Sequence, residues 1–299
     1  MTGQADFESR LADCARRLEN RLTEQLDART GLSADRLLAA MRHAVLGGGK
    51  RFRPFLLMEA AALFGVAPDT TLEAATAVEY IHAYSLVHDD LPCMDDDDLR
   101  RGKPTVHIAF DEATAVLAGD ALQTMAFEVL SSERAHSDPS IRAELVSILA
   151  TAAGLLGMGG GQMLDLEAET APDGSADIAR IQSMKTGALI SAAVAMGAAI
   201  GGATAKERES LAAYAENLGL AFQISDDLLD VTGDAETIGK ATSKDASAGK
   251  ATFISLLGID GAREKLAGTE VAALSALDGF GPRAGQLRDA MRFMSERQS

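Results

Sequence analysis

The chain has 299 residues, of which 47% are hydrophobic and 4% aromatic, and its formal net charge is −16. A charge of this sign excludes nucleic-acid binding as an expected function, because binding a phosphate backbone requires basic patches. Cys14 and Cys93 form neither a disulfide framework nor a metal motif. The sequence shows no apolar run of about twenty residues and no signal peptide, so we expect a cytoplasmic protein without a membrane span.

The composition favours helices throughout the chain. Alanine and leucine are the most frequent residues, and both, like the methionines and glutamates of the chain, are good helix formers. Between Phe7 and Leu26, apolar residues recur every three or four positions, which predicts a first amphipathic helix. Asp111 is a suitable cap for a later helix that reaches about Leu130. Because no linker rich in Pro, Gly or Ser divides the chain, we predict one all-α domain over residues 1–299.

A glycine run precedes a group of basic residues. A second helix is predicted from an N-cap at Ser33 through Val45, and Gly47–Gly49 ends it. Lys50, Arg51 and Arg53 follow at once. Glycines allow the backbone to approach a ligand closely, so these basic side chains are candidates for an anion site. A glycine cap followed by solvated basic residues would give the same pattern.

The next predicted helix, over residues 71–88, runs into an acidic cluster. Six aspartates fall between Asp89 and Asp98, and Pro92 cannot continue the helix. Aspartates at a helix C-terminus meet the negative end of the helix dipole, which is unfavourable unless a cation binds there. By itself, this run could also be a solvated acidic loop.

A second apolar helix ends in the same way. Its last turns contain Asp226, Asp227 and Asp230, and the first and last of these lie on one helix face, where like charges repel. Two such clusters facing each other would form an oxygen cage for Mg²⁺, which prefers a few carboxylates together with substrate phosphates. The sequence lacks the Asp-x-Asp-x-Asp-Gly pattern of a calcium-binding loop.

At these residues the chain resembles the trans-isoprenyl diphosphate synthase family, and most of all its bacterial farnesyl diphosphate synthases. The resembling segments are Gly48–Pro54, Asp89–Arg101, Gly159–Gln162, Lys185–Gly187, Gln223 with Asp226–Asp230, Gly239–Lys240 and Gly249–Thr252. The resemblance implies the isoprenoid synthase fold, a bundle of ten or more mostly antiparallel helices around a central apolar cleft. It also implies a homodimer.

The resemblance further implies a role for each matching residue. By the family pattern three Mg²⁺ ions would bind, and their ligands would be Asp89, Asp90, Asp95, Asp226 and Asp230. Isopentenyl diphosphate would be bound by Lys50, Arg53, His82 and Arg101. The allylic diphosphate would be bound by Arg100, Lys185 and Lys240, and the developing carbocation would be stabilised by Thr186 and Gln223. Of these, the catalytic residues would be Lys185, Thr186, Gln223 and Lys240.

The expected reaction is a head-to-tail condensation that gives farnesyl diphosphate. In this reaction Mg²⁺ assists the ionisation of dimethylallyl or geranyl diphosphate, and isopentenyl diphosphate attacks the resulting cation. Tyr84, five residues before Asp89, and the small Ser85 resemble the pattern of a fifteen-carbon product. Tyr84 could equally be a core residue.

Three other functions are compatible with parts of this pattern. The first is a synthase of the same family that makes geranylgeranyl diphosphate or another chain length. The second is a class I terpene cyclase, although cyclases line their cavities with aromatics, which are few here. The third is a non-catalytic partner subunit, which would be expected to lose aspartates from one cluster, whereas both clusters are intact.

Overall fold

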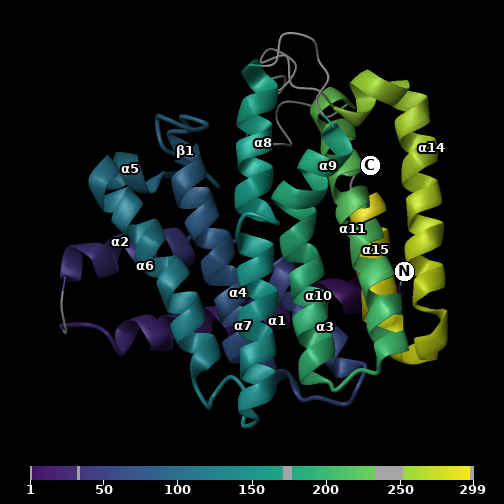
Figure 1. Ribbon diagram of the computed structural model, residues 1–299, viewed down its shortest axis with the longest axis horizontal. Coiled ribbons are helices and arrows are strands. Elements are labelled where there is room, and N and C mark those ends of the chain that lie inside the picture. The colour runs from purple at the N-terminus through teal and green to yellow at the C-terminus, as the bar shows by residue number, and fades with distance from the viewer. Residues whose placement is uncertain (1, 32–33, 171–176, 233–251, 297–299) are drawn as a thin grey trace. The chain divides into compact units, whose positions relative to one another are not determined.

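The computed structural model describes residues 2–31, 34–170, 177–232 and 252–296 (Figure 1). Apart from one short hairpin, the regular elements in these ranges are helices, which confirms the predicted all-α class. The chain divides into two compact units, which are described separately. Unit 1 comprises residues 1–58 and 66–146, and unit 2 comprises residues 59–65 and 147–299. The division falls within two helices, α3 (Phe52–Ala62) and α7 (Pro139–Ala153).

Unit 1 is built around a central helix, α4. Its elements are α1 (Thr2–Asp27), α2 (Asp35–Val45), α4 (Pro68–Asp89), the hairpin strands β1 (Leu99–Arg100) and β2 (Lys103–Pro104), α5 (Val106–Ala109) and α6 (Glu112–Ser131). Helix α4 packs against α1, α2 and α6 and is buried along most of its length. Its many alanines allow these neighbours to approach closely. The predicted first amphipathic helix is confirmed as α1, and Asp111 caps α6 by accepting from the Thr114 N–H.

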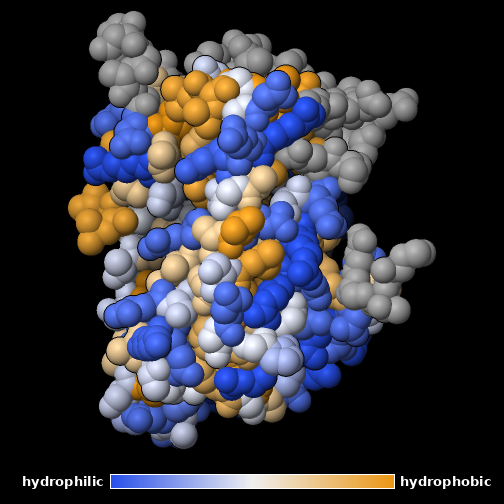
Figure 2. All heavy atoms as spheres, turned by 90° about the vertical axis from the view of Figure 1, so that its right-hand side faces the viewer, coloured by the Kyte–Doolittle hydropathy of each residue, from blue (hydrophilic) through white to orange (hydrophobic). Residues whose placement is uncertain are grey.

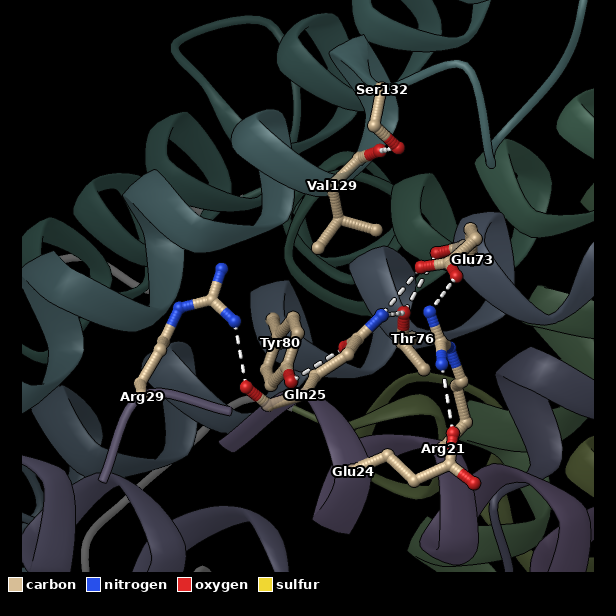
Figure 3. A network of polar contacts seen from close by, with 9 residues as sticks. All are labelled: Arg21, Glu24, Gln25, Arg29, Glu73, Thr76, Tyr80, Val129 and Ser132. Atoms are coloured by element: carbon tan, nitrogen blue, oxygen red, sulfur yellow. Dashed lines mark hydrogen bonds and ion pairs between the residues drawn. The ribbon is translucent and has the colours of Figure 1, made fainter. Parts of the chain in front are cut away.

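A buried polar network fixes α4 to α1 (Figure 3). The amide of Gln25 donates to Glu73 at 2.5 Å, and the hydroxyl of Tyr80 donates to the Gln25 Oε1 at 2.8 Å. Arg21 forms an ion pair with the same Glu73. Buried polar groups are tolerated when they are hydrogen-bonded. Because each bond joins α1 to α4, the network fixes how α4 is rotated about its own axis.

Unit 2 is built around helix α11. Its elements are α8 (Met158–Thr170), α9 (Ile178–Gln182), the π-helix η1 (Ser183–Gly187), α10 (Ala188–Ile200), α11 (Ala205–Thr232), α14 (Phe253–Ala276), the 3₁₀-helix η2 (Asp278–Ala284) and α15 (Gly285–Ser295). Helix α11 packs against η1, α10, α14 and α15. Two buried hydroxyls join it to α15, since Tyr214 donates to Leu287 O at 2.7 Å and Ser225 donates to Met294 O at 2.8 Å.

Most apolar side chains in the described residues are buried, but several on α14 are not. Leu256 is 63% exposed and Leu257 is 47% exposed, just before Gly258, where the helix is kinked by a φ of 69°. In Figure 2, which looks onto the side of the molecule that carries α14, apolar atoms gather near the upper end of the view. Scattered apolar side chains of this kind are common on protein surfaces.

Two segments are long and apolar enough to cross a membrane by length and composition, which the sequence pattern did not predict. They are Pro139–Ala168 and Ile178–Ile200, and 33% and 61% of their most apolar windows are buried. The second segment contains α10, whose side chains are almost all buried. Buried core helices of soluble proteins pass the same test, and the expected lack of a membrane span stays a prediction.

Candidate functional site

The first acidic cluster begins where α4 ends and the chain folds back on itself. The Asp95 N–H donates to Asp89 O at 2.8 Å, and the Asp97 N–H donates to Asp90 O at 3.3 Å. Asp96 adopts a left-handed conformation with a φ of 50°, which tightens the turn. Because of these bonds, two predicted metal ligands, the half-buried Asp89 and the exposed Asp95, come from adjacent stretches of backbone.

Asp90, a third predicted metal ligand, is buried and bound by an arginine. Arg100 donates to the Asp90 Oδ1 through Nε at 2.7 Å and through Nη2 at 2.5 Å, and its Nη2 also lies 3.8 Å from an oxygen of Asp97. Burial raises the pKa of Asp90, although the bonds from Arg100 oppose that shift. The structure therefore pairs a predicted metal ligand directly with a predicted diphosphate ligand.

The glycine run and the hairpin meet in unit 1. Gly48 and Gly49 have φ values of 89° and 128°, which favour glycine. The Arg101 Nη1 donates to Gly48 O, and a side chain at Gly49 would place its Cβ 2.6 Å from the Arg101 Cζ. The guanidinium of Arg101 therefore occupies the space that these glycines leave open. The glycines directly precede Lys50 in the sequence.

His82 faces this basic group from α4. Its Nε2 lies 3.4 Å from the Arg53 Nη1, and since arginine can only donate, Nε2 accepts and the ring proton is on Nδ1. Removal of the His82 ring from water disfavours its charged form, and the positive charges of Arg53 and Arg101 add to this effect. Together they hold the pKa of His82 well below its ordinary value. The structure thus brings together three of the four residues predicted to bind isopentenyl diphosphate, with His82 neutral.

Arg51, the remaining basic residue of this segment, has a structural role. Its guanidinium is buried, forms an ion pair with Glu79 on α4, and donates to Val45 O at 2.6 Å. Its own backbone is left-handed, with a φ of 50°. A buried charge must be paired and hydrogen-bonded to be tolerated. Arg51 therefore attaches the segment after the glycine run to α4, which the sequence pattern did not indicate.

Tyr84, the predicted chain-length residue, lies on the side of α4 that packs against α6. It is half-buried, its ring meets the His88 ring edge to face at a centroid distance of 5.8 Å, and burial raises its pKa. The His88 Nε2 lies 3.1 Å from Val116 O, above Gly119, where a Cβ would come within 2.5 Å of the imidazole Cδ2. Ser85 is buried, and its hydroxyl donates to His82 O at 2.9 Å.

In unit 2, Lys185 and Thr186 lie in the π-helix η1. Such wide turns are rare in helices and are frequent at functional sites. The Lys185 Nζ donates to the Asp165 Oδ2 on α8 at 2.7 Å, and both side chains are partly exposed. At Gly161 on α8, a Cβ would lie 2.8 Å from the Lys185 Cα, so the two backbones are in direct contact. Gly161 therefore allows tight packing between α8 and η1.

The middle of α11 lies beside the same π-helix. A Cβ at Gly219 would lie 3.1 Å from the Gly187 Cα, and Gln223, one turn further along α11, is buried. Asp226 is half-buried and Asp230 is exposed. Unit 2 therefore carries Lys185, Thr186 and Gln223 on two elements in mutual contact.

Within the described residues, no three His, Cys, Asp or Glu side chains are gathered closely enough to hold a metal ion. Asp89, Asp90 and Asp95 belong to unit 1, whereas Asp226 and Asp230 belong to unit 2. The donors present, carboxylate oxygens at helix ends, fit Mg²⁺, which binds through one or two carboxylates together with substrate phosphates and water. Lys240 lies outside the described residues, as do Gly239 and Gly249–Ala251.

Comparison with known proteins identifies the family. A sequence model of the polyprenyl synthetase family matches residues 34–272. The chain belongs to this family. This polyprenyl synthetase is 47% identical over 264 residues to the farnesyl diphosphate synthase of Escherichia coli K12, with 87% of each chain covered. It is also 47% identical over 249 residues to geranylgeranyl pyrophosphate synthase 9, chloroplastic, of Arabidopsis thaliana, which covers 81% of this chain and 69% of the relative.

Solved structures agree with these relatives. An FPP/GFPP synthase from Zymomonas mobilis matches with a TM-score of 0.86 and 46% identity, over 97% of this chain and 99% of the other. A geranyltransferase from Legionella pneumophila matches with a TM-score of 0.87 and 33% identity, over 98% of both chains. The predicted family, the isoprenoid synthase fold and the prenyltransferase activity are thereby confirmed.

Two residues at these sites were missed by sequence reasoning. Glu79 neutralises the buried Arg51, and Asp227, next to a predicted metal ligand, accepts a hydrogen bond from the backbone N–H of Phe253. Part of the Asp227 contact had a sequence signal, because Thr252 and Ser255 have the spacing of a helix start. That signal marks the helix whose first N–H Asp227 accepts, but it does not point to Asp227. For Glu79 the sequence held no signal beyond its position in a predicted helix, which the structure shows to be buried.

Proposed function

We propose that this polyprenyl synthetase joins isopentenyl diphosphate head to tail to an allylic diphosphate and that its main product is farnesyl diphosphate. Bacterial farnesyl diphosphate synthases match at 43–48% identity, which supports this product, and geranylgeranyl synthases match at a similar identity over a smaller share of their own length. The observation that carries the choice is Tyr84, a half-buried aromatic ring that lies about one turn before the first acidic cluster.

Isopentenyl diphosphate would bind in unit 1 to Lys50, Arg53, His82 and Arg101. The guanidinium groups can each form paired hydrogen bonds with phosphate oxygens. His82 is neutral before binding, and an anion beside it would raise its pKa and favour the charged form. In this way a chain of net charge −16 can offer a locally positive site to an anionic substrate.

The allylic diphosphate would bind to Arg100, Lys185 and Lys240, together with Mg²⁺ ions held by Asp89, Asp90, Asp95, Asp226 and Asp230. When bound, Mg²⁺ supplies positive charge that stabilises the leaving diphosphate. Lys185 forms an ion pair with Asp165 in the free protein, so it has to exchange that partner for a phosphate oxygen. Arg100, which is bound to Asp90, is positioned to contact a diphosphate and a metal ligand at once.

The reaction breaks the bond between C1 of the allylic substrate and its diphosphate oxygen. The C3–C4 double bond of isopentenyl diphosphate then attacks C1 through C4, and a proton leaves C2 for the released diphosphate. Oxygen dipoles from Thr186 and Gln223 stabilise the positive charge that develops on the allylic group. Gln223 is buried, so its dipole acts where water does not screen it.

The chain length would be limited by Tyr84, with the small Ser85 beside it. Burial of each added five-carbon unit contributes about 4 kcal/mol of favourable free energy. The chain therefore keeps growing until the cavity is blocked. Tyr84 is supported by His88, which is in turn seated on the Gly119 backbone. A ring supported from behind can stop a growing chain, whereas an unsupported ring would rotate away.

We further propose three Mg²⁺ ions, a homodimer, a cytoplasmic location and the action of residues 1–299 as one catalytic domain. The family match from residue 34 to 272 extends over both compact units, which supports the last of these. Equilibrium sedimentation would test the dimer, and metal titration by calorimetry in the presence of a non-hydrolysable allylic analogue would test the ion count.

Product analysis tests the proposed function. The purified chain is incubated with Mg²⁺, isopentenyl diphosphate and either dimethylallyl, geranyl or farnesyl diphosphate, and the products are separated by mass. We expect a fifteen-carbon diphosphate from the first two allylic substrates and little reaction with the third. A twenty-carbon product would favour the geranylgeranyl alternative, and a hydrocarbon formed without isopentenyl diphosphate would favour a cyclase. No turnover under any of these conditions would point to a non-catalytic subunit.

A further inference from the structure

The three aspartates at the end of α11 have different surroundings. Asp226 is half-buried and Asp230 is exposed, whereas only 9% of Asp227 is accessible to solvent. Residues four apart lie on one helix face, while consecutive residues are rotated by about 100°. Asp227 therefore projects from α11 in a different direction from the Asp226 and Asp230 pair.

The buried carboxylate of Asp227 caps the start of helix α14. Its Oδ2 accepts a hydrogen bond of 2.7 Å from the backbone N–H of Phe253, the first residue of α14. The first N–H groups of a helix have no partner within the helix, and a carboxylate is stabilised by the positive end of the dipole there. Helices α11 and α14 pack side by side (Figure 1), so this bond joins the second acidic cluster to its neighbour.

A separate cap at the same helix start satisfies other groups. The Thr252 Oγ1 accepts from the Ser255 N–H at 3.2 Å, and the Ser255 Oγ accepts from the Thr252 N–H at 2.9 Å. This reciprocal pair is a capping box. Because it leaves the Phe253 N–H to Asp227, the two caps complement each other, and loss of Asp227 would leave a buried donor without its acceptor.

On the basis of the proposed function, we propose that Asp227 is a positioning residue and not a metal ligand. Its carboxylate holds the end of α11 against α14, so that Asp226 and Asp230 keep the directions in which they meet the metal ions. This role requires a hydrogen-bond acceptor of the right size, which the amide oxygen of asparagine also provides. A ligand role requires charge, since Mg²⁺ favours carboxylate oxygens.

Asparagine substitution separates the two roles. Steady-state kinetics of the full chain are compared for Asp227→Asn, Asp227→Ala and Asp226→Asn, with kcat, KM for the allylic diphosphate and the Mg²⁺ dependence as readouts. We expect Asp227→Asn to stay within about threefold of the unsubstituted chain, because the cap is retained. Asp227→Ala should lose about tenfold in kcat/KM and need more Mg²⁺, and Asp226→Asn should lose about 100-fold.

Asp111→Ala is the matched control, because Asp111 caps another helix by accepting from the Thr114 N–H at 2.7 Å. It should lower thermal stability without changing the Mg²⁺ dependence. The proposal is overturned if Asp227→Asn loses as much activity as Asp226→Asn, which would indicate a ligand. It is also overturned if Asp227→Ala behaves as the unsubstituted chain does.

Amide hydrogen exchange at Phe253 gives a readout that does not depend on catalysis. We expect Asp227→Ala to lower the protection of this amide about tenfold and Asp227→Asn to preserve it. Unchanged protection in Asp227→Ala would refute the anchoring bond. If the exchange follows this expectation while the unsubstituted chain forms no prenyl product, the proposed function has failed and the anchoring of α11 to α14 stands.

Discussion

Substitution of Gly161 by alanine should inactivate the enzyme while it remains folded. The added Cβ would lie 2.7 Å from the Met184 carbonyl carbon and 2.8 Å from the Lys185 Cα, both in backbone. Carbon atoms pack at about 3.5–4.0 Å, so the π-helix has to move by about 1 Å. Overpacking costs about 1–3 kcal/mol, which the better helix propensity of alanine offsets by about 1 kcal/mol. A displacement of about 1 Å at Lys185 and Thr186 should lower kcat/KM about 100-fold.

Gly268→Ala is the matched control for this substitution. Gly268 lies within α14, and no atom is within 4 Å of its added Cβ, so this variant should keep full activity and gain up to about 1 kcal/mol of stability. Stability is measured by urea unfolding, and activity by release of diphosphate. Wild-type kcat/KM in a folded Gly161→Ala variant would refute the reasoning, because it would show that the position of the π-helix does not matter for catalysis.

Three further predictions concern unit 1. Asp89→Ala should lower turnover by a factor of about 100 or more with the far-ultraviolet circular dichroism unchanged, and near-normal activity with Mg²⁺ would contradict its metal role. Tyr84→Ala should lengthen the product beyond fifteen carbons in the mass assay, whereas an unchanged product distribution would show that Tyr84 is only a core residue. His82 has a lowered pKa in the folded chain, so the unfolded chain takes up the proton first and stability should fall as the pH drops below about 6.5. Urea unfolding at pH 7 and pH 5 should show a loss about 1–2 kcal/mol greater for the wild type than for His82→Gln, and equal losses would exclude this cause.

Local sequence signals predicted most of the helices, since their periods and caps act within a few residues. The helix that ends at Asp89 and the cap at Asp111 are examples. The segment Gly159–Gln162 could be recognised as a motif of the family, but the contact of Gly161 with the backbone of Lys185 could not be identified from spacing alone. Contacts between distant segments depend on the whole fold, and local patterns do not contain them.

In the candidate site, too, local patterns were predictable and contacts between distant residues were not. Residue types and their order indicated metal and diphosphate chemistry, because few other functions need two aspartate clusters and several arginines. The resemblance left Arg51 and Asp227 out of the ligand sets, but what each does instead was not predictable. Arg51 and Asp227 look like their neighbours in the sequence, yet burial turns one into the partner of Glu79 and the other into a helix cap. Only the contacts that each side chain makes in the folded chain distinguish these roles.

In the π-helix at Ser183–Gly187, the direction of the Lys185 side chain depends on the number of residues in the turn and not on the identity of any one side chain. A π turn accommodates one residue more than the α turns around it. Deleting a single residue there would let the helix close into a regular spiral and swing Lys185 about its axis, away from Asp165. Scanning substitutions would overlook this dependence, because they leave the length of the chain unchanged.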